Sequence, residues 1–241
     1  TTLPEVMVST ISAVSGHGEI AYGNAIGSVI CNAALIAAIT VAVRPGKVDP
    51  KTLRVPVAFF FAAAAIYCVA AYGMGRFTRP MGLLMLGMFV AYMAANVWQM
   101  KNAPAEPEHE EEPMGIGKIV LLLVVGAALI ALGANLLVDN GTIIAQAMGV
   151  PESVIALTFV ALGTSLPELV TAITSLMKGH SDLSLGNVVG ANVFNLVLVS
   201  GMSVTLAPFE IPQSATLFGI NSSLVLELPV MLLVMVLALL L

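Results

Sequence analysis

The chain has 241 residues, of which 59% are hydrophobic and 10% charged, and its formal net charge is −5. A soluble domain is about a quarter charged, so this composition and the mean hydropathy of +1.00 exclude a soluble globular protein. The apolar residues stand in runs long enough to cross a bilayer, which takes about 20 residues per helix. The sequence therefore predicts an all-α polytopic membrane protein that lies in the lipid bilayer and binds no nucleic acid.

In chain order, turn-rich or charged stretches separate eight predicted apolar segments. They cover residues 1–14, 20–43, 53–73, 81–100, 116–138, 151–177, 183–206 and 217–241. A Pro- and Glu-rich stretch at 101–113 is typical of a flexible, solvated linker. This linker divides the chain into an N-terminal half, 1–100, and a C-terminal half, 114–241.

The basic residues predict the orientation of these segments. All nine Lys and Arg lie in loops or at the ends of apolar segments. If the acidic linker is cytoplasmic, seven of them are cytoplasmic and only Arg76 and Arg79 are outside. Such an excess is the usual positive-inside bias. We therefore expect a multi-pass protein of the cell membrane with a cytoplasmic linker.

An internal repeat is the most informative pattern in the sequence. Residues 1–45 align with residues 164–208 without a gap, at a constant offset of 163, and fourteen positions are identical. The string TTLPE falls on TSLPE, and GNAIGS falls on GNVVGA. Counting segments predicts that 1–14 runs outward and 151–177 inward, so the copies have opposite orientations. Inverted repeats are a recurring architecture of secondary transporters, with the substrate site at the midplane.

Glu5 and Glu168 are equivalent in the two copies, and each follows a proline. A carboxylate at hydrocarbon depth costs several kcal/mol, so it must face protein, water or a cation. The proline removes a backbone N–H and frees a carbonyl oxygen one turn back. Nearby hydroxyls come from Thr1, Thr2, Thr164 and Ser165. Together these groups form the oxygen ligand set that hard cations prefer. The alternative, a pair of glutamates that cap helix ends, is disfavoured because both copies carry the pattern.

The glycine-rich segments predict a second wall of the site. Their glycines are four residues apart, a spacing that lets helices approach closely. Asn32 and Asn195 lie nine residues after the leading glycines, where an amide oxygen is available to a cation. Ser28 lies one turn before Asn32 on the same face, but its equivalent is Ala191. Asn24 and its equivalent in the second copy either ligate an ion or bond between helices.

Three other polar residues are set apart from the site. His17 and His180 occupy equivalent loop positions and are interpreted as solvated turn residues, with gating as the alternative. Glu227 precedes a proline in the last segment and has no equivalent in the repeat. We therefore expect it near the bilayer surface and outside the site.

The strings TTLPE…GNAIGSVICN and ALGTSLPELVTAITS…GNVVGANVFN resemble the two α-repeats of the cation/calcium antiporter superfamily. The similarity is greatest to its prokaryotic sodium/calcium exchanger-like branch and covers essentially the whole chain. It implies ten transmembrane helices in two inverted halves of five, joined by a cytoplasmic loop at 101–113. Against that fold the chain lacks the first helix, part of the second and the last. We expect a fragmentary sequence rather than a natural eight-helix transporter.

The resemblance also implies a ligand set. Glu5 and Glu168 coordinate calcium and sodium, and the polar residues around them are Thr1, Thr2, Thr164, Ser165, Ser28, Asn32 and Asn195. The family has serine where this chain has Ala191, so one hydroxyl is absent. The two carboxylates carry a charge of −2, which one calcium ion or two sodium ions neutralise.

The implied function is secondary antiport of calcium against sodium by alternating access, with both ions as partners and no cofactor. A calcium/proton antiporter is the first alternative, because a glutamate pair also carries protons. A cation channel uses similar oxygen ligands, but the inverted repeat argues against it. An enzyme is disfavoured because the sequence has no H-E-x-x-H or G-x-S-x-G string.

Overall fold

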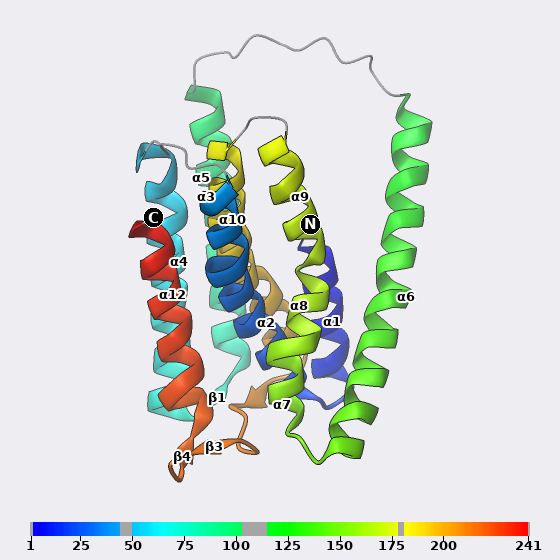
Figure 1. Ribbon diagram of the computed structural model, residues 1–241, viewed down its shortest axis with the longest axis vertical. Helices are drawn as coiled ribbons and strands as arrows, with labels where there is room; N and C mark the ends of the chain where they lie inside the picture. Colours follow the sequence, from blue (N-terminus) through cyan, green and yellow to red (C-terminus); the bar gives the residue numbers. More distant parts are fainter. Residues whose placement is uncertain (1, 44–49, 103–114, 178–180, 241) are drawn as a thin grey trace.

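A computed structural model describes residues 2–43, 50–102, 115–177 and 181–240, which form a bundle of roughly parallel helices (Figure 1). The α-helices are α1 Leu3–Val14, α2 Gly18–Ile30, α3 Ala37–Val43, α4 Pro50–Cys68, α5 Arg79–Asn102, α6 Ile116–Met148, α7 Glu152–Ile155, α8 Ala161–Thr164, α9 Leu166–Met177, α10 Ser181–Phe194, α11 Ser200–Leu206 and α12 Leu228–Leu240. The π-helical segments are η1 Cys31–Ile36, η2 Val69–Met74, η3 Ala156–Val160, η4 Asn195–Val199 and η5 Ser223–Glu227. The two-residue strands are β1 Arg76–Phe77, β2 Phe209–Glu210, β3 Thr216–Leu217 and β4 Ile220–Asn221.

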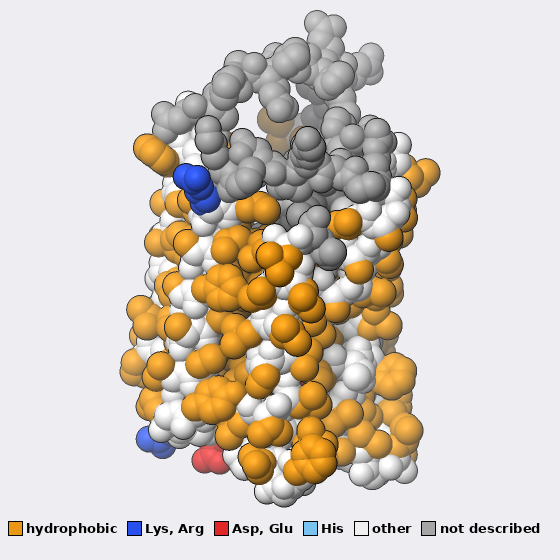
Figure 2. Space-filling view, turned by 60° about the vertical axis from the view of Figure 1, so that its left-hand side comes forward, with side chains coloured by type: hydrophobic (Ala, Val, Ile, Leu, Met, Phe, Trp, Pro, Cys, Tyr) orange, Lys and Arg blue, Asp and Glu red, His pale blue; other side chains and the backbone are white. Residues whose placement is uncertain are grey.

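Within the described residues, five continuous helical runs are long and apolar enough to cross a membrane. They are Gly18–Val43, Thr52–Met74, Arg79–Lys101, Gly186–Leu206 and Ser223–Leu240. Two further helices, Ser153–Thr164 and Leu166–Met177, meet at a bend of 41° and together are also long and apolar enough to cross a membrane. Hydrophobic side chains cover the middle of the face seen in Figure 2, and the visible charged side chains lie near its ends. The predicted helical membrane protein is thus confirmed.

Two segment boundaries predicted from the sequence are wrong. The last segment does not begin as a helix, because β3 and β4 pair as a hairpin with Leu217 opposite Ile220. Gly219 forms the turn with a φ of 76°, a conformation that glycine adopts at no steric cost. The segment predicted at 116–138 continues as α6 to Met148, where Gly149 has a φ of 63°. A left-handed glycine just after the last turn is a common helix end.

The two copies of the repeat run in opposite directions. In Figure 1, α1 descends while α9 rises, and α2 with α3 rises while α10 with α11 descends. Each copy has the same local breaks: Thr2 (φ −67°, ψ 5°) and Ser165 (φ −85°, ψ 3°) have similar backbone angles. The π-helical segments η1 and η4 also occupy equivalent positions. The repeat therefore reproduces backbone irregularities as well as residues.

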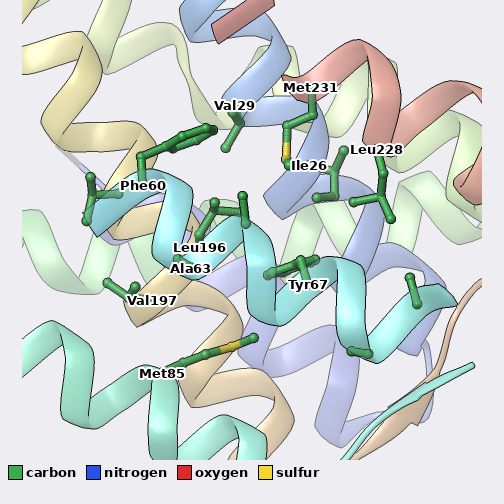
Figure 3. Packing of buried hydrophobic residues seen from close by; sticks show 14 of the residues in the cluster. Ile26, Val29, Phe60, Ala63, Tyr67, Met85, Leu196, Val197, Leu228 and Met231 are labelled. Atoms are coloured by element: carbon green, nitrogen blue, oxygen red, sulfur yellow. The ribbon is translucent and has the colours of Figure 1, made fainter. Parts of the chain in front are cut away.

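The main hydrophobic core lies where helices of both halves meet. Phe60 and Tyr67 of α4 are fully buried or nearly so, together with Ile26 of α2, Leu196 of η4 and Leu228 of α12. Figure 3 shows these side chains turned toward one another. This contact holds α2, which continues into η1 with Asn32, and η4, which begins at Asn195, in one packed unit.

Close packing of the glycine segments differs between the copies. A Cβ at Gly27 would lie 2.4 Å from the carbonyl oxygen of Leu157, and a Cβ at Gly23 would also meet backbone. Helix α2 therefore touches the main chain of α7 and η3, as the glycine spacing predicts. Among the described residues, a Cβ at Gly186 would meet nothing within 4 Å, and one at Gly190 would meet only the hydroxyl of Tyr92, at 3.5 Å. Within the described chain, the pair of glycines four residues apart therefore packs closely against another helix in the first copy of the repeat but not in the second.

Candidate cation-binding site

Broken helices place the two glutamates. Helices α1 and α9 begin at Leu3 and Leu166, so Pro4 and Pro167 lie in the first turn, where the missing N–H costs no helical bond. Glu5 and Glu168 follow directly and therefore also lie in the first turn. The N-terminal end of a helix carries a partial positive charge that stabilises a carboxylate. Local sequence thus explains how a negative charge is held at this depth.

The two copies meet in a reciprocal pair of hydrogen bonds. Thr2 Oγ1 donates to Glu168 Oε1 at 3.4 Å, and Ser165 Oγ donates to Glu5 Oε1 at 3.3 Å. Each hydroxyl thus reaches the carboxylate of the other copy. Glu5 is fully buried and Glu168 is 6% exposed, and their charges are close enough to repel each other. The carboxylates therefore form one shared site.

A second contact joins the copies through Asn24. Thr164 Oγ1 donates to Asn24 Oδ1 at 2.9 Å, while Asn24 Nδ2 donates to Ser9 Oγ at 2.9 Å. The hydroxyl of Ser28 lies 3.4 Å from that of Thr164. Of the two roles open from the sequence, Asn24 therefore bonds between helices α1, α2 and α8. Its equivalent, Asn187, is exposed.

Ser9 was missed by the sequence analysis. It is fully buried and receives the Asn24 bond. Its equivalent in the second copy is Ala172, so comparison of the copies could not reveal it. Its position one turn after Glu5, on the same face of α1, is the available sequence signal.

The amides of Asn32 and Asn195 are buried and lack protein partners. Both side-chain atoms of each amide, and Glu5 Oε2, make no hydrogen bond to any described residue. Asn32 lies in η1, which contacts α9, and Asn195 opens η4, which contacts α1. Each amide is thus on an element that packs against the glutamate-bearing helix of the other copy. A buried polar atom without a partner costs about 1–3 kcal/mol, and π-helical turns are frequent at functional sites.

The structure brings most of the predicted residues together. Hydrogen bonds join Thr2 to Glu168, Ser165 to Glu5 and Ser28 to Thr164, and all of these residues except the half-buried Thr2 are buried. Thr1 lies outside the described residues. Ala191 is buried and supplies no hydroxyl. No group of three or more His, Cys, Asp and Glu able to hold a metal occurs in the described part of the chain. The arrangement offers two carboxylates with neutral oxygens, a ligand set for hard cations.

Replacing Asn24 with Ala is expected to destabilise the protein by about 1–3 kcal/mol, because the buried hydroxyls of Thr164 and Ser9 each lose a partner. The thermal midpoint in detergent measures this effect. The matched control is Asn140→Ala, since Asn140 is exposed and bonds only within its own helix among the described contacts. Equal midpoints for the two variants would contradict the bridging role of Asn24.

Two oppositely oriented broken helices that meet at buried carboxylates define the class of the fold, a helical membrane transporter with inverted repeats. The family model described as sodium/calcium exchanger protein matches residues 1–98 and 118–241. The chain belongs to this family. It is therefore a multi-pass membrane antiporter of the cation/calcium class and not an enzyme.

Individual relatives agree with this assignment. The putative antiporter CaxA of Alkalimonas amylolytica is 34% identical over 221 residues, which are 88% of this chain and 68% of that protein. The inner membrane protein YrbG of Escherichia coli (strain K12) is 34% identical over 224 residues, 89% of this chain and 69% of that one. A structure of the sodium-calcium exchanger NCX_Mj, soaked with Na⁺ and Sr²⁺, has a TM-score of 0.66 and 27% identity, and the alignment covers 98% of this chain and 74% of that one.

Proposed function

We propose that this protein exchanges calcium against sodium across the cell membrane, and that both ions use the site between Glu5 and Glu168. The observation that carries the proposal is the reciprocal pair of hydroxyl–carboxylate contacts between the inverted copies. Two buried carboxylates require about two positive charges, which one calcium ion or two sodium ions supply. The similarity to NCX_Mj, which is described as a sodium-calcium exchanger, supports the same pair of ions.

The proposed ligands come from both copies. The carboxylates are those of Glu5 and Glu168, the hydroxyls are those of Thr1, Thr2, Thr164, Ser165 and Ser28, and the amides are those of Asn32 and Asn195. The buried amide oxygens without protein partners support this set, because coordination to an ion would satisfy them. The set lacks a hydroxyl at Ala191, so the copies do not contribute equal numbers of neutral ligands.

The charge of the site explains why transport is coupled exchange. Without a bound cation, the two carboxylates repel each other at membrane depth, where an unneutralised charge costs at least several kcal/mol. The carrier therefore changes orientation only when its charge is neutralised by calcium or by sodium. Because both ions need the same two carboxylates, they bind in competition. Alternating access then turns this competition into exchange.

The proposed orientation places the 101–113 linker in the cytoplasm. Lys101 ends α5 and Lys118 lies in the first turn of α6, at the upper end of the bundle in Figure 1. Arg76 and Arg79 lie at the opposite end, in β1 and at the start of α5. The lysines beside the linker and the two arginines thus lie at opposite ends of the bundle. Because cytoplasmic loops carry the excess of Lys and Arg, this arrangement supports a cytoplasmic location for the upper end.

Ion-gradient experiments in proteoliposomes test the coupling. We expect vesicles loaded with Na⁺ and diluted into Na⁺-free medium to take up calcium, and a pH gradient at equal Na⁺ to drive no uptake. Calcium uptake driven by the pH gradient alone would show that protons, and not sodium ions, are the coupling ions. Single-channel currents that need no counter-ion would show that the protein is a channel and not an antiporter. Empty liposomes supply the control.

A further inference from the structure

A third buried carboxylate, that of Glu227, lies away from the exchange site and its two glutamates. Glu227, at the end of η5, is only 3% exposed, so its carboxylate is buried within the protein. Ser222 Oγ donates to its Oε1 at 2.8 Å, and Ser223 Oγ donates to its Oε2 at 3.0 Å. None of the groups found to act on Glu227 is a basic side chain, as far as the described residues extend. A buried negative charge of this kind needs a cation to neutralise it.

The hydroxyl of Tyr22 is directed at the same place. Tyr22 is fully buried, and its hydroxyl makes no hydrogen bond of ordinary geometry to a described residue. Of the side chains around the hydroxyl, Glu227 and Ser223 interact with it most strongly. The ring is held between Tyr67 and Phe77, at centroid distances of 6.4 and 6.1 Å. A fixed phenol oxygen beside a buried carboxylate, without a hydrogen bond of ordinary geometry to the described residues, is the second observation that indicates a ligand.

This cluster is separate from the exchange site. Helix α2 carries Asn24 and Ser28, whose contacts are with α1 and α8. Tyr22 lies on the same helix but contacts the aromatic side chains of α4 and β1 and interacts with Ser223 and Glu227 of η5. The two clusters therefore lie on different sides of α2.

A further negative charge stands beside the cluster. Glu19, half-buried in the first turn of α2, accepts hydrogen bonds from the backbone N–H of Gln213, at 3.3 Å, and from the hydroxyl of Ser214. Its charge acts on Glu227. Negative charge near a site raises the local concentration of cations, so Glu19 favours a cation beside Glu227.

We propose that Glu227, Ser222, Ser223 and Tyr22 form a second cation site that takes one monovalent cation, Na⁺. The ligands are all oxygens, as a hard cation requires, and one carboxylate balances one positive charge. Each serine donates its proton to the carboxylate and keeps lone pairs for an ion. A proton would supply the same charge, and the sodium and pH arms of the experiment below distinguish a proton from Na⁺.

Thermal unfolding of the purified protein in detergent tests this site, with choline chloride replacing NaCl at constant ionic strength. The background is Glu168→Gln, which disables the exchange site. We expect Na⁺ to raise the midpoint in a saturable way, since a ligand that binds the folded state stabilises it. Adding Glu227→Gln should abolish this rise, whereas adding Glu210→Gln, on exposed β2, should preserve it.

Two results would overturn the proposal. One is a sodium-dependent rise that survives Glu227→Gln. The other is no sodium-dependent rise at any pH while acidification alone protects the protein, which would make the site one for a proton. If the double variant does not fold, crystals of the unmodified protein soaked in Tl⁺ decide: anomalous density beside Glu227 supports the site and its absence refutes it. Calcium binding by the unmodified protein tests the exchange site independently of Glu227. Failure of the proposed exchange function can therefore be told apart from failure of the proposed second cation site.

Discussion

Replacing Glu168 with Gln is expected to abolish calcium binding and exchange. The substitution keeps the size of the side chain and removes one of the two negative charges that a calcium ion contacts. A unit charge and a divalent ion 4 Å apart interact by about 8 kcal/mol at an effective dielectric constant of about 20, so a loss of at least about 1,000-fold in affinity, or about 4 kcal/mol, is expected. Isothermal titration with calcium and uptake into sodium-loaded proteoliposomes measure the two effects. Glu5→Gln should behave in the same way, because the copies contribute equivalent carboxylates.

The control for charge removal is Glu210→Gln. Glu210 is an exposed glutamate on β2 at the end of the bundle, so its replacement should leave calcium affinity within the error of the measurement. Wild-type calcium affinity in Glu168→Gln would refute Glu168 as a ligand. A loss in Glu168→Gln but not in Glu5→Gln would mean that the carboxylates are not equivalent, against the shared site proposed here.

Replacing Gly27 with Ala is the second change with a large expected effect. Its new Cβ would lie 2.4 Å from the carbonyl oxygen of Leu157 and 2.6 Å from the Cβ of Ala161. Both neighbours belong to packed helical segments, so α2 must move away from η3 and α8. Overpacking of this kind costs about 1–3 kcal/mol. Since Ser28 follows Gly27 and contacts Thr164, calcium affinity should fall together with the thermal midpoint.

The matched control for this variant is Gly87→Ala. Gly87 lies within α5, and a Cβ there would meet nothing within 4 Å in the described structure. Alanine is a better helix former than glycine by about 1 kcal/mol, so the midpoint of this variant should stay equal or rise. If Gly27→Ala matched Gly87→Ala in both midpoint and calcium affinity, the close approach of α2 to η3 would play no part in shaping the site.

The two proposed cation sites give α2 a double role. Its Asn24 and Ser28 belong to the contacts of the exchange site, and its Tyr22 belongs to the Glu227 cluster. Both sets of contacts reach across helices rather than along one. An ion at either place therefore holds α2 against a neighbouring element, α8 in one case and η5 in the other.

The sequence by itself determined the class of the protein and the centre of the candidate site. Composition and the length of the apolar runs are sufficient for a helical membrane protein, because crossing hydrocarbon requires about 20 apolar residues. The duplicated Pro-Glu pair could be recognised because the two copies align without a gap, so equivalent residues stand at a constant offset. Glu5 and Glu168 could be singled out since a buried carboxylate is costly, and its occurrence at equivalent positions indicates a function.

Only the tertiary structure decided what each polar residue contacts. Asn24 and Asn187 are identical in the repeat, yet one bridges three helices and the other is exposed, because the described chain packs a partner against one copy alone. The reciprocal bonds of Thr2 and Ser165 join residues more than 150 positions apart, which no local pattern encodes. Glu227 is buried because Tyr22 and the serines of η5 close around it. A sequence records which groups are costly to bury, but the partners that offset the cost come from distant segments and exist only after packing.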